Sequence, residues 1–283
     1  MKRILVTGAN SYIGNSFQSY INDHFSDEYV IDVLDMLGDG WRQADFSGYD
    51  CILHVAGIAH QKETKKNAWM YYTVNRDLAV NTAKKAKAEG VKQFVFMSSM
   101  SVYGMDMGVI TRETVPNPKS HYGKSKLQAE QNISALEDRS FKVVIVRPPM
   151  VYGRNCRGNF QSVVRLVQKL PVFPKVRNQR STIYIQHLSA FLELVIRGNN
   201  SGVFMPQNAE YAETSYMATQ IAEKLGKTMR LSGIMGLAVK GARPFVGMIK
   251  KAFGTLIYRD CEDFDFSYCS VELSETYKNS VGD

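Results

Sequence analysis

A tyrosine and a lysine lie four residues apart in the segment Tyr122-Gly123-Lys124-Ser125-Lys126. On a helix this spacing puts both side chains on one face. A tyrosine that transfers protons near neutral pH needs a pKa below the ~10 of a free phenol. A nearby positive charge favours the phenolate and lowers that pKa. We therefore predict that Tyr122 is an acid/base and Lys126 its electrostatic partner, although a Tyr-x-x-x-Lys spacing alone also arises by chance.

Hydroxyl residues follow an apolar run in the segment Phe94–Gly104, which has the sequence FVFMSSMSVYG. We expect a buried strand here, with Ser99 at its carboxyl end. Ligands of doubly wound sheets bind at this end of the strands. We predict that Ser99 hydrogen-bonds the substrate oxygen whose proton Tyr122 transfers. The alternative is a serine-rich turn between a strand and a loop.

A glycine-containing segment, Val6-Thr7-Gly8-Ala9-Asn10-Ser11-Tyr12-Ile13-Gly14, follows an expected strand and opens an expected helix. Glycines here let the backbone turn tightly and approach a pyrophosphate, while the helix N-terminus supplies N–H donors. The usual spacing is G-x-x-G-x-x-G, and Ser11 replaces the middle glycine. Serine is small and caps helices well. The segment therefore predicts a dinucleotide site that includes Gly8, Asn10, Ser11, Tyr12, Ile13 and Gly14.

Asp35 follows the second expected strand, Tyr29–Leu34. A carboxylate at this point accepts hydrogen bonds from the adenosine ribose and repels a 2′-phosphate, which favours NAD over NADP. Asp32 and Asp39 lie close by, so a solvated carboxylate at the strand end is the alternative. We expect NAD as the cofactor, and NADP stays open.

The first two thirds of the chain alternate short β-branched runs with helix-length segments, which is typical of a parallel α/β sheet. The expected strands are Arg3–Thr7, Tyr29–Leu34, Cys51–Val55, Gln93–Ser98 and Val143–Arg147. Expected helices include Gly14–His24 and Thr73–Glu89, and Gly90 is the expected stop of the second. After Pro149 the regularity breaks. We expect residues 1–153 to form the cofactor-binding core and residues 154–283 to form mainly a substrate-binding region, with some chain returning to the sheet.

These motifs, in this order, resemble the extended short-chain dehydrogenases, the NAD-dependent epimerase/dehydratase family of nucleotide-sugar enzymes. The likeness covers nearly the whole chain and implies a Rossmann-type doubly wound sheet of about seven mainly parallel strands. It also implies further contacts. The cofactor side adds Asp45, Phe46, Val55, Ala56, Gly57, Asn75, Ser98 and Pro148. The substrate side consists of Ser99, Met100, Ser101, Asn159, Phe160 and Arg180, the last of which meets a diphosphate.

Departures from the family pattern narrow the reaction. Dehydratases of this family carry an Asp-Glu pair directly after the catalytic hydroxyl, where this chain has Met100-Ser101. Enzymes of the family that invert C3 or C5 need a cysteine where Ser101 stands. Two reactions at C4 of a UDP-sugar remain. We favour reduction of a UDP-4-keto-6-deoxy-N-acetylhexosamine in surface polysaccharide synthesis, because the compact length and the segments 54–60 and 178–181 resemble the 4-ketoreductases. The alternative is a UDP-hexose 4-epimerase with retained NAD.

A third hypothesis is a non-catalytic NAD(H)-binding sensor or scaffold, since fold does not fix function. The retained Ser99, Tyr122 and Lys126 argue against it.

His60 is expected to be solvated.

Charge is uneven along the 283 residues, whose net charge is +8. Residues 142–251 hold 17 basic and 4 acidic side chains. An anionic ligand such as a sugar diphosphate explains this bias with the fewest assumptions, and no nucleic-acid module accompanies it. The four cysteines lack the spacing of metal ligands or of a disulfide scaffold, so we expect no metal. No secretory signal or membrane span is visible, and we expect a cytoplasmic protein.

Residues 234–256 mix apolar side chains with lysines and arginine. Such a segment is compatible with an anionic membrane. We expect instead a lobe with its basic residues toward solvent or the diphosphate, because glycine and proline interrupt an amphipathic helix. The resemblance finally implies a homodimer joined through the helices 73–89 and 122–136.

Overall fold

A computed structural model describes residues 1–59, 61–242 and 246–282. The chain divides into two compact units. Unit 1 consists of Met1–Gly104, Val115–Pro148 and Leu188–Pro206, and unit 2 of Met105–Thr114, Pro149–His187 and Gln207–Asp283. The chain first leaves unit 1 for a short excursion at Met105, then again at Pro149, close to the expected division at residue 153. His60, expected to be solvated, lies outside the described residues.

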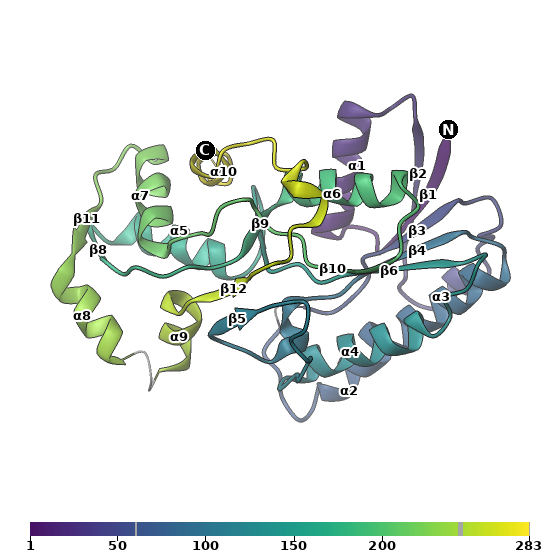
Figure 1. Ribbon diagram of the computed structural model, residues 1–283, viewed down its shortest axis with the longest axis horizontal. Coiled ribbons are helices and arrows are strands. Elements are labelled where there is room, and N and C mark those ends of the chain that lie inside the picture. The colour runs from purple at the N-terminus through teal and green to yellow at the C-terminus, as the bar shows by residue number, and fades with distance from the viewer. Residues whose placement is uncertain (60, 243–245, 283) are drawn as a thin grey trace. The chain divides into compact units, whose positions relative to one another are not determined.

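Unit 1 is built on a six-stranded, fully parallel sheet (Figure 1). The strand order is β10-β6-β4-β3-β1-β2. The bounds are β1 Lys2–Thr7, β2 Tyr29–Leu34, β3 Cys51–His54, β4 Gln93–Met97, β6 Lys142–Val146 and β10 Gly202–Phe204. Five of these strands match the expected ones to within a residue at each end. The expected count of about seven was slightly too high for this sheet, and β10 belongs to the returning chain.

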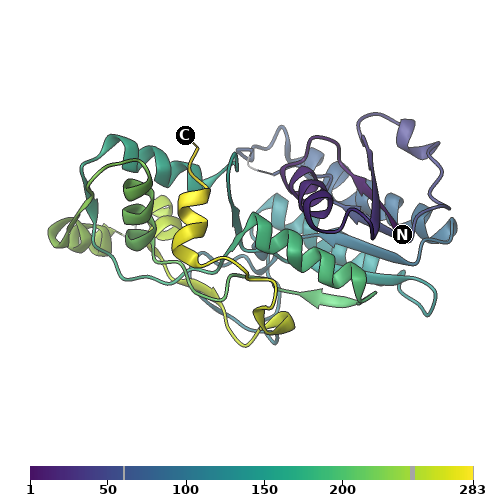
Figure 2. The same ribbon diagram turned by 90° about the horizontal axis from the view of Figure 1, so that it is seen from above.

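Helices cover both faces of this sheet (Figures 1 and 2). One face carries α1 and α6, and the other carries α2, α3 and α4. Their bounds are α1 Tyr12–His24, α2 Ala68–Tyr71, α3 Ala79–Ala88, α4 His121–Ser134 and α6 Ile185–Arg197, with short turns η1 Gly40–Arg42 and η3 Met100–Tyr103. Alternate strand residues such as Ile52, Phe94 and Val143 pack with alanines of α3 in a closed core. The doubly wound parallel fold is therefore confirmed.

The expected helix Thr73–Glu89 begins with a wider turn than a regular α-helix. Residues Tyr72–Leu78 (η2) form a π-helical stretch before α3. Such stretches are rare and are frequently found at functional sites. Here the stretch holds Asn75, which is fully buried. The predicted stop is confirmed, because α3 ends at Ala88 and Gly90 has a φ of 83°.

Unit 2 contains three short parallel strand pairs, β5–β12, β7–β9 and β8–β11. Tyr152 and Phe160 stack in its core with ring centroids 5.2 Å apart. The strands are β5 Gly108–Ile110, β7 Met150–Tyr152, β8 Val172–Pro174, β9 Thr182–Tyr184, β11 Arg230–Ser232 and β12 Leu256–Tyr258. The helices are α5 Asn159–Lys169, α7 Thr214–Lys224, α8 Gly233–Ala242, α9 Gly247–Phe253, η4 Asp263–Phe266 and α10 Leu273–Asn279. Across the described residues, every helix is too short or too polar to cross a membrane.

His54 is a buried titratable group in the middle of the sheet of unit 1. Its ring stacks on Phe94 and Phe96 of the neighbouring strand, and its Nδ1 lies 2.7 Å from the hydroxyl of Thr7. Burial, and to a smaller extent the positive charge of Lys126, lowers the pKa of His54 to about 3. The folded protein therefore holds this imidazole neutral.

We predict that the free energy of unfolding falls as the pH drops below the ordinary histidine pKa of ~6.5. Below that pH the unfolded chain binds a proton that folded His54 excludes, so the loss reaches about 2 kcal/mol near pH ~5 and is absent above pH ~7. Denaturant titrations over this range measure the slope. His54→Gln should lose that part of it, and a variant with the wild-type slope would contradict the assignment.

Candidate functional site

The glycine loop after β1 is pressed against the end of β3. The Thr7 carbonyl accepts hydrogen bonds from the amides of both Val55 and Ala56, at 3.1 and 2.9 Å. Gly8 has a φ of 113°, and a Cβ at this position would lie 2.8 Å from the Ala56 nitrogen. A larger residue would meet both a backbone clash and an unfavourable conformation. The first glycine of the motif is thus needed for close packing.

Ser11 takes the position of the missing glycine and caps α1. Its side-chain oxygen accepts a hydrogen bond from the amide of Gly14 at 3.1 Å, which confirms the expected N-cap. Asn10 adopts a left-handed φ of 61°, a conformation that asparagine tolerates. Tyr12 and Ile13 begin the helix, whose first turn carries no acidic residue. This helix N-terminus therefore suits an anionic group.

Asp35 is the acidic side chain that lies exposed directly after β2. The carbonyl of Leu34 accepts the Gly8 amide at 2.9 Å, so this strand end adjoins the glycine loop. One carboxylate oxygen of Asp35 accepts the Leu37 amide at 3.0 Å. The neighbouring candidates have other partners, since Asp32 binds Arg3 and Tyr49 while Asp39 binds Arg42. The geometry thus singles out Asp35 from its neighbours.

Asp45 and Phe46 differ in what they expose. The carboxylate of Asp45 is exposed and accepts the Ser47 amide at 2.8 Å; hydrogen bonds from Ser47 lower its pKa. The Phe46 ring is completely buried in the core, and its amide donates to the Glu89 carboxylate at 2.6 Å. The structure therefore gives Phe46 the contacts of a core residue.

Lys126 points from α4 toward the ends of β3 and β4. Its ammonium group donates to the Met97 carbonyl at 2.7 Å, and burial lowers its pKa to about 8, against a smaller upward effect of Glu130. A Cβ on Gly57 would lie 3.3 Å from this nitrogen and 3.0 Å from the Asn75 side-chain oxygen. The three residues therefore border one small space.

Asn75 fixes the loop after β3. Its amide oxygen accepts the Ile58 amide at 2.7 Å, and its nitrogen donates to the Ile58 carbonyl at 3.0 Å. The same nitrogen lies 3.4 Å from the Ser125 hydroxyl of α4. Asn75 thus joins the loop that carries Gly57 to the helix that carries Lys126.

Tyr122 and Ser99 lie within hydrogen-bonding reach of each other. Burial raises the pKa of Tyr122, the hydrogen bond with the Ser99 hydroxyl lowers it, and Tyr71 raises it slightly. The prediction that the positive charges of Lys126 and a bound nicotinamide lower this pKa stays a prediction. The two hydroxyls are the expected pair for proton transfer at one substrate oxygen.

Ser98–Ser101 is held from both sides. The Ser99 hydroxyl accepts the Ser101 amide at 3.1 Å and so caps the short turn η3. The Met100 amide donates to the Pro148 carbonyl at 2.9 Å. Gly123 of α4 approaches so closely that a Cβ there would lie 2.6 Å from the Ser101 carbonyl oxygen. This glycine lets α4 bring Tyr122 up to Ser99.

Glu63 was missed in the sequence because it belongs to no helix or motif. Its carboxylate accepts the amides of His121 and Tyr122, at 2.9 and 3.0 Å, at the beginning of α4. Ser120 caps the same helix by accepting the Gly123 amide at 3.0 Å. A carboxylate at a helix N-terminus is favoured by the helix dipole. Glu63 therefore fixes the backbone of the predicted acid/base.

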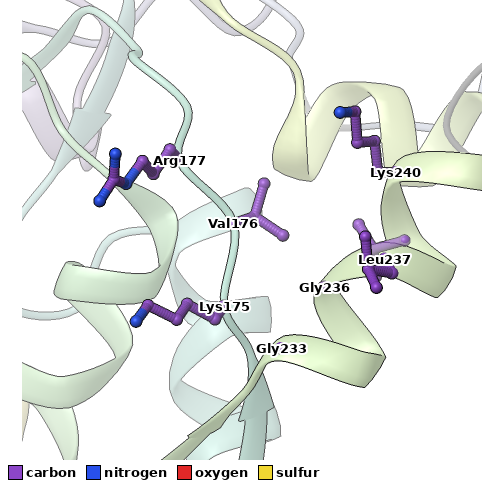
Figure 3. A pocket seen from close by; sticks show the side chains of 8 residues that line it. Lys175, Val176, Arg177, Gly233, Gly236, Leu237 and Lys240 are labelled. Atoms are coloured by element: carbon purple, nitrogen blue, oxygen red, sulfur yellow. The ribbon is translucent and has the colours of Figure 1, made fainter.

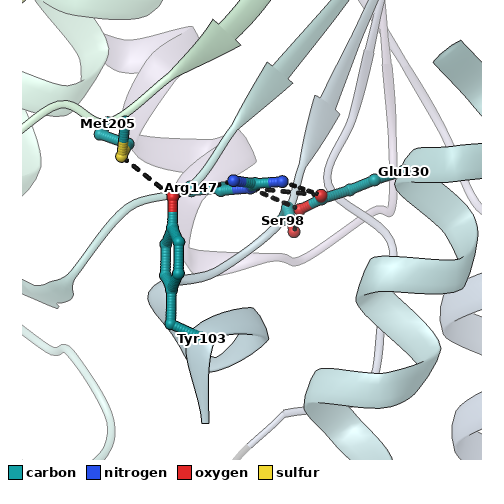
Figure 4. Close-up of polar contacts among 5 residues, drawn as sticks. All are labelled: Ser98, Tyr103, Glu130, Arg147 and Met205. Atoms are coloured by element: carbon teal, nitrogen blue, oxygen red, sulfur yellow. Dashed lines mark hydrogen bonds and ion pairs between the residues drawn. The ribbon is translucent and has the colours of Figure 1, made fainter. Parts of the chain in front are cut away.

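A buried ion pair lies beneath the hydroxyl residues, and it too was not foreseen (Figure 4). Arg147, at the end of β6, donates to the Glu130 carboxylate of α4, with the shortest contact at 2.6 Å. Ser98 donates to the same carboxylate, and Arg147 donates to the Tyr103 hydroxyl at 2.8 Å. The hydroxyl of Ser98 is therefore used in a hydrogen bond with the Glu130 carboxylate.

Asn159, Phe160 and Arg180 belong to unit 2. Asn159 is exposed in the first turn of α5, whereas Phe160 is buried against Tyr152 and has the contacts of a core residue. The Arg180 guanidinium donates to the Gly254 carbonyl at 3.0 Å. Burial lowers its pKa, and Asp106 acts in the opposite direction.

The arrangement in unit 1 fits a dinucleotide. The glycine loop and the acid-free N-terminus of α1 would hold a pyrophosphate, and the carboxylate of Asp35 would hold a ribose. Lys126 and Asn75 border Gly57, which follows the same carboxyl end of β3. No cluster of metal-ligating side chains occurs among the residues that the structure covers.

Comparison with known proteins agrees with this fit. A profile described as the NAD dependent epimerase/dehydratase family matches residues 4–203. A UDP-glucose 4-epimerase of Vibrio cholerae is 30% identical over 80% of this chain and 76% of its own length. A GDP-6-deoxy-D-mannose reductase of Pseudomonas aeruginosa is 25% identical over 72% and 73%, respectively.

A solved structure shows that the likeness extends to the fold. It is a UDP-glucuronic acid 4-epimerase from Bacillus cereus in complex with NAD. Its TM-score is 0.74 at 18% identity, and the match covers 98% of this chain and 97% of that one.

We predict that Glu63→Ala lowers both stability and activity. Two amides at the start of α4 lose their acceptor, which should cost about 1 kcal/mol in the free energy of unfolding. Turnover should fall more than KM rises, because Tyr122 is displaced. Thermal unfolding and steady-state kinetics measure both. Glu137→Ala, an exposed glutamate after the other end of α4, is the control, and equal behaviour of the two variants would contradict the role of Glu63.

Gly123→Ala separates helix propensity from close packing. Alanine stabilises a helix interior by about 1 kcal/mol relative to glycine. The new methyl group would nevertheless meet the Ser101 carbonyl, so we predict lower turnover and no gain in stability. A variant that is more stable and fully active would show that α4 does not need this close approach.

Proposed function

Because the chain belongs to the NAD-dependent epimerase/dehydratase family of nucleotide-sugar epimerases and reductases, we propose that it is a UDP-hexose 4-epimerase. The observation that carries this choice is the 30% identity, over 80% of the chain, to a protein named UDP-glucose 4-epimerase. The sequence alone favoured the 4-ketoreductase. The similarity to this relative favours the epimerase over the reductase. An experiment is needed to identify the sugar, which is glucose or N-acetylglucosamine in this proposal.

The chemistry proposed is an oxidation and re-reduction at C4. NAD, held by the glycine loop and Lys126, would supply the hydride acceptor and donor for this carbon, so that the hydride returns to the opposite face of the sugar. Tyr122 takes the proton from the C4 hydroxyl and later gives it back, while Ser99 hydrogen-bonds the same oxygen. Lys126, protonated below a pKa of about 8, supplies a positive charge on the same helix and a donor for the cofactor ribose.

One acid/base pair is sufficient for this reaction. Proton transfer at C5 or C6 would need additional acids after Ser99, and Met100 and Ser101 cannot supply them. This supports exchange at a single carbinol carbon over dehydration.

The second candidate is a 4-ketoreductase acting on a UDP-4-keto-6-deoxy-N-acetylhexosamine. Support comes from the reductase among the relatives and from the resemblance of the segments 54–60 and 178–181. The same pair would then donate a proton to the C4 oxygen once. NAD is the cofactor of the family, and the exposed carboxylate of Asp35 supports NAD over NADP.

The binding roles of the other site residues, the location of the protein and its oligomeric state are also proposals. Arg180 is proposed to meet the diphosphate and Asn159 the sugar nucleotide. Asp45 is proposed to contact the adenine. The proposal for Phe46 and Phe160 is limited to their backbone, since both rings are buried. A cytoplasmic homodimer joined through α3 and α4 is likewise proposed.

Removal of the Tyr122 hydroxyl tests its role. We predict that Tyr122→Phe lowers turnover by about 10²-fold or more, because general acid/base catalysis contributes at least that much. The fold and cofactor binding should persist. Ser101→Ala, which removes a neighbouring hydroxyl, should have a much smaller effect. A loss of only a few-fold in Tyr122→Phe would reject the tyrosine as the proton carrier.

An absorbance assay at the reduced-nicotinamide band distinguishes the two candidates. The protein is offered UDP-glucose or UDP-N-acetylglucosamine without added cofactor, and separately the 4-keto sugar with NADH or NADPH. C4 epimers that interconvert without net cofactor change establish the epimerase. Stoichiometric loss of reduced cofactor with the keto sugar alone would replace it with the reductase, and inactivity in both assays would favour the sensor hypothesis.

A further inference from the structure

Helix α8 of unit 2 exposes an apolar face. Its sequence is GIMGLAVKGA, in which Lys240 is the only charged or polar side chain. Ile234 is 83% exposed and Leu237 is 71% exposed. The outward face of a helix on a water-soluble domain is normally polar. The apolar face of α8 therefore calls for an explanation beyond folding.

The packing of α8 explains which residues point outward. Gly236 is buried, and a Cβ there would lie only 2.1 Å from the Lys175 carbonyl oxygen. This contact fixes the side of the helix that meets the chain after β8. Ile234, two residues before this contact, is turned away from it, whereas Leu237, one residue after it, borders a pocket that Lys175 and Lys240 also line. Their exposure is thus built into the packing of unit 2.

Cationic side chains surround the inner border of the same helix. Lys175, Arg177 and Lys240 line a pocket of about 350 Å³ beside α8 (Figure 3). These three residues come from two segments, the chain after β8 and the helix itself. The sequence has no Asp or Glu between Asp138 and Glu193, or between Glu223 and Asp260. The two segments that form the pocket therefore carry no acid of their own.

We propose that α8 and the cations beside it bind the surface of an anionic phospholipid bilayer. Ile234 and Leu237 enter the boundary between headgroups and acyl chains, and Lys175, Arg177 and Lys240 contact lipid phosphates. This combination of apolar and cationic side chains on two adjoining segments is the chemistry of interfacial membrane binding. The binding is peripheral and reversible, because one helix of ten residues offers a small apolar area.

Charge decides between a membrane and the other occupants of such a surface. A second copy seated on this face by two-fold symmetry would bring two sets of these three cations into one interface that has no acid from either pocket segment. A nucleic acid would use the cations but would leave Ile234 and Leu237 without apolar partners. An anionic bilayer satisfies both parts of the surface.

Vesicle sedimentation of the full chain tests the proposal without any sugar nucleotide, so its outcome is independent of the proposed function. Vesicles of phosphatidylcholine are compared with vesicles of phosphatidylcholine and phosphatidylglycerol. We expect binding to the mixed vesicles only, weakened by added salt. Binding that is equal for both vesicle types, or absent from both, would overturn the proposal.

Two double variants locate the surface. Ile234→Ser/Leu237→Ser removes the apolar contacts, and Lys175→Glu/Lys240→Glu reverses two charges. Each should weaken binding to the mixed vesicles by roughly 10-fold or more. The matched controls lie in unit 1: Leu37→Ser, at a leucine that is 84% exposed, and Lys84→Glu/Lys92→Glu. Controls that lose as much binding as the test variants would show that the effect is general charge or hydrophobicity.

Light scattering after size exclusion tests whether a second copy of the chain binds the α8 surface instead. The serine double variant should keep the oligomeric state of the wild type. A change from a larger to a smaller assembly would overturn the proposal in favour of an interface between copies of the chain.

Discussion

The buried ion pair of Glu130 and Arg147 holds together the three elements on which the candidate site depends. Arg147 follows β6, Glu130 lies on α4, and Ser98, which donates to Glu130, follows β4. Burial opposes the charge of Arg147, but the hydrogen bonds with Glu130 prevail, so the pKa of the guanidinium is raised. Removing one partner would leave a buried charge without compensation, which is far more costly than losing an exposed pair.

This constraint determines where the chemistry can occur. Once α4 is fixed against the ends of β4 and β6, Tyr122 and Lys126 have a defined position along the sheet edge. Gly123 lets the helix approach, and Glu63 holds its first turn. The ion pair acts at the middle of α4, and the other two act at its beginning. Proton transfer needs this accuracy, because a hydrogen bond weakens steeply when its atoms are misplaced.

The electrostatics of the site reflect its burial. Burial raises the pKa of Tyr122 and lowers that of Lys126, so both shifts disfavour the charged forms. The Ser99 hydroxyl is the group in the protein that counteracts the first shift. A positive charge close to Tyr122 would act in the same direction as Ser99. The tyrosine is therefore sensitive to what is bound beside it.

Features that depend on neighbouring residues along the chain could be predicted from the amino-acid sequence. Strand and helix periodicity located β1, β2, β3, β4 and β6 to within a residue, and the spacing of Gly8, Ser11 and Gly14 predicted the capped helix α1. The Tyr122–Lys126 spacing and the serines after β4 identified the chemistry. Such patterns are legible because they arise from local backbone geometry and from burial that repeats with the period of the element.

Contacts between residues that lie far apart in the sequence could be seen only in the folded protein. Glu63 contacts the start of α4 from a loop, and Glu130 contacts Arg147 at the edge of the sheet. No local sequence pattern predicted either contact. The fold also put the rings of Phe46 and Phe160 into cores, and it gave Asp32 to Arg3 and Tyr49 while leaving Asp35 exposed. Burial and long-range contacts set these outcomes, and neither is a property of the neighbouring residues in the sequence.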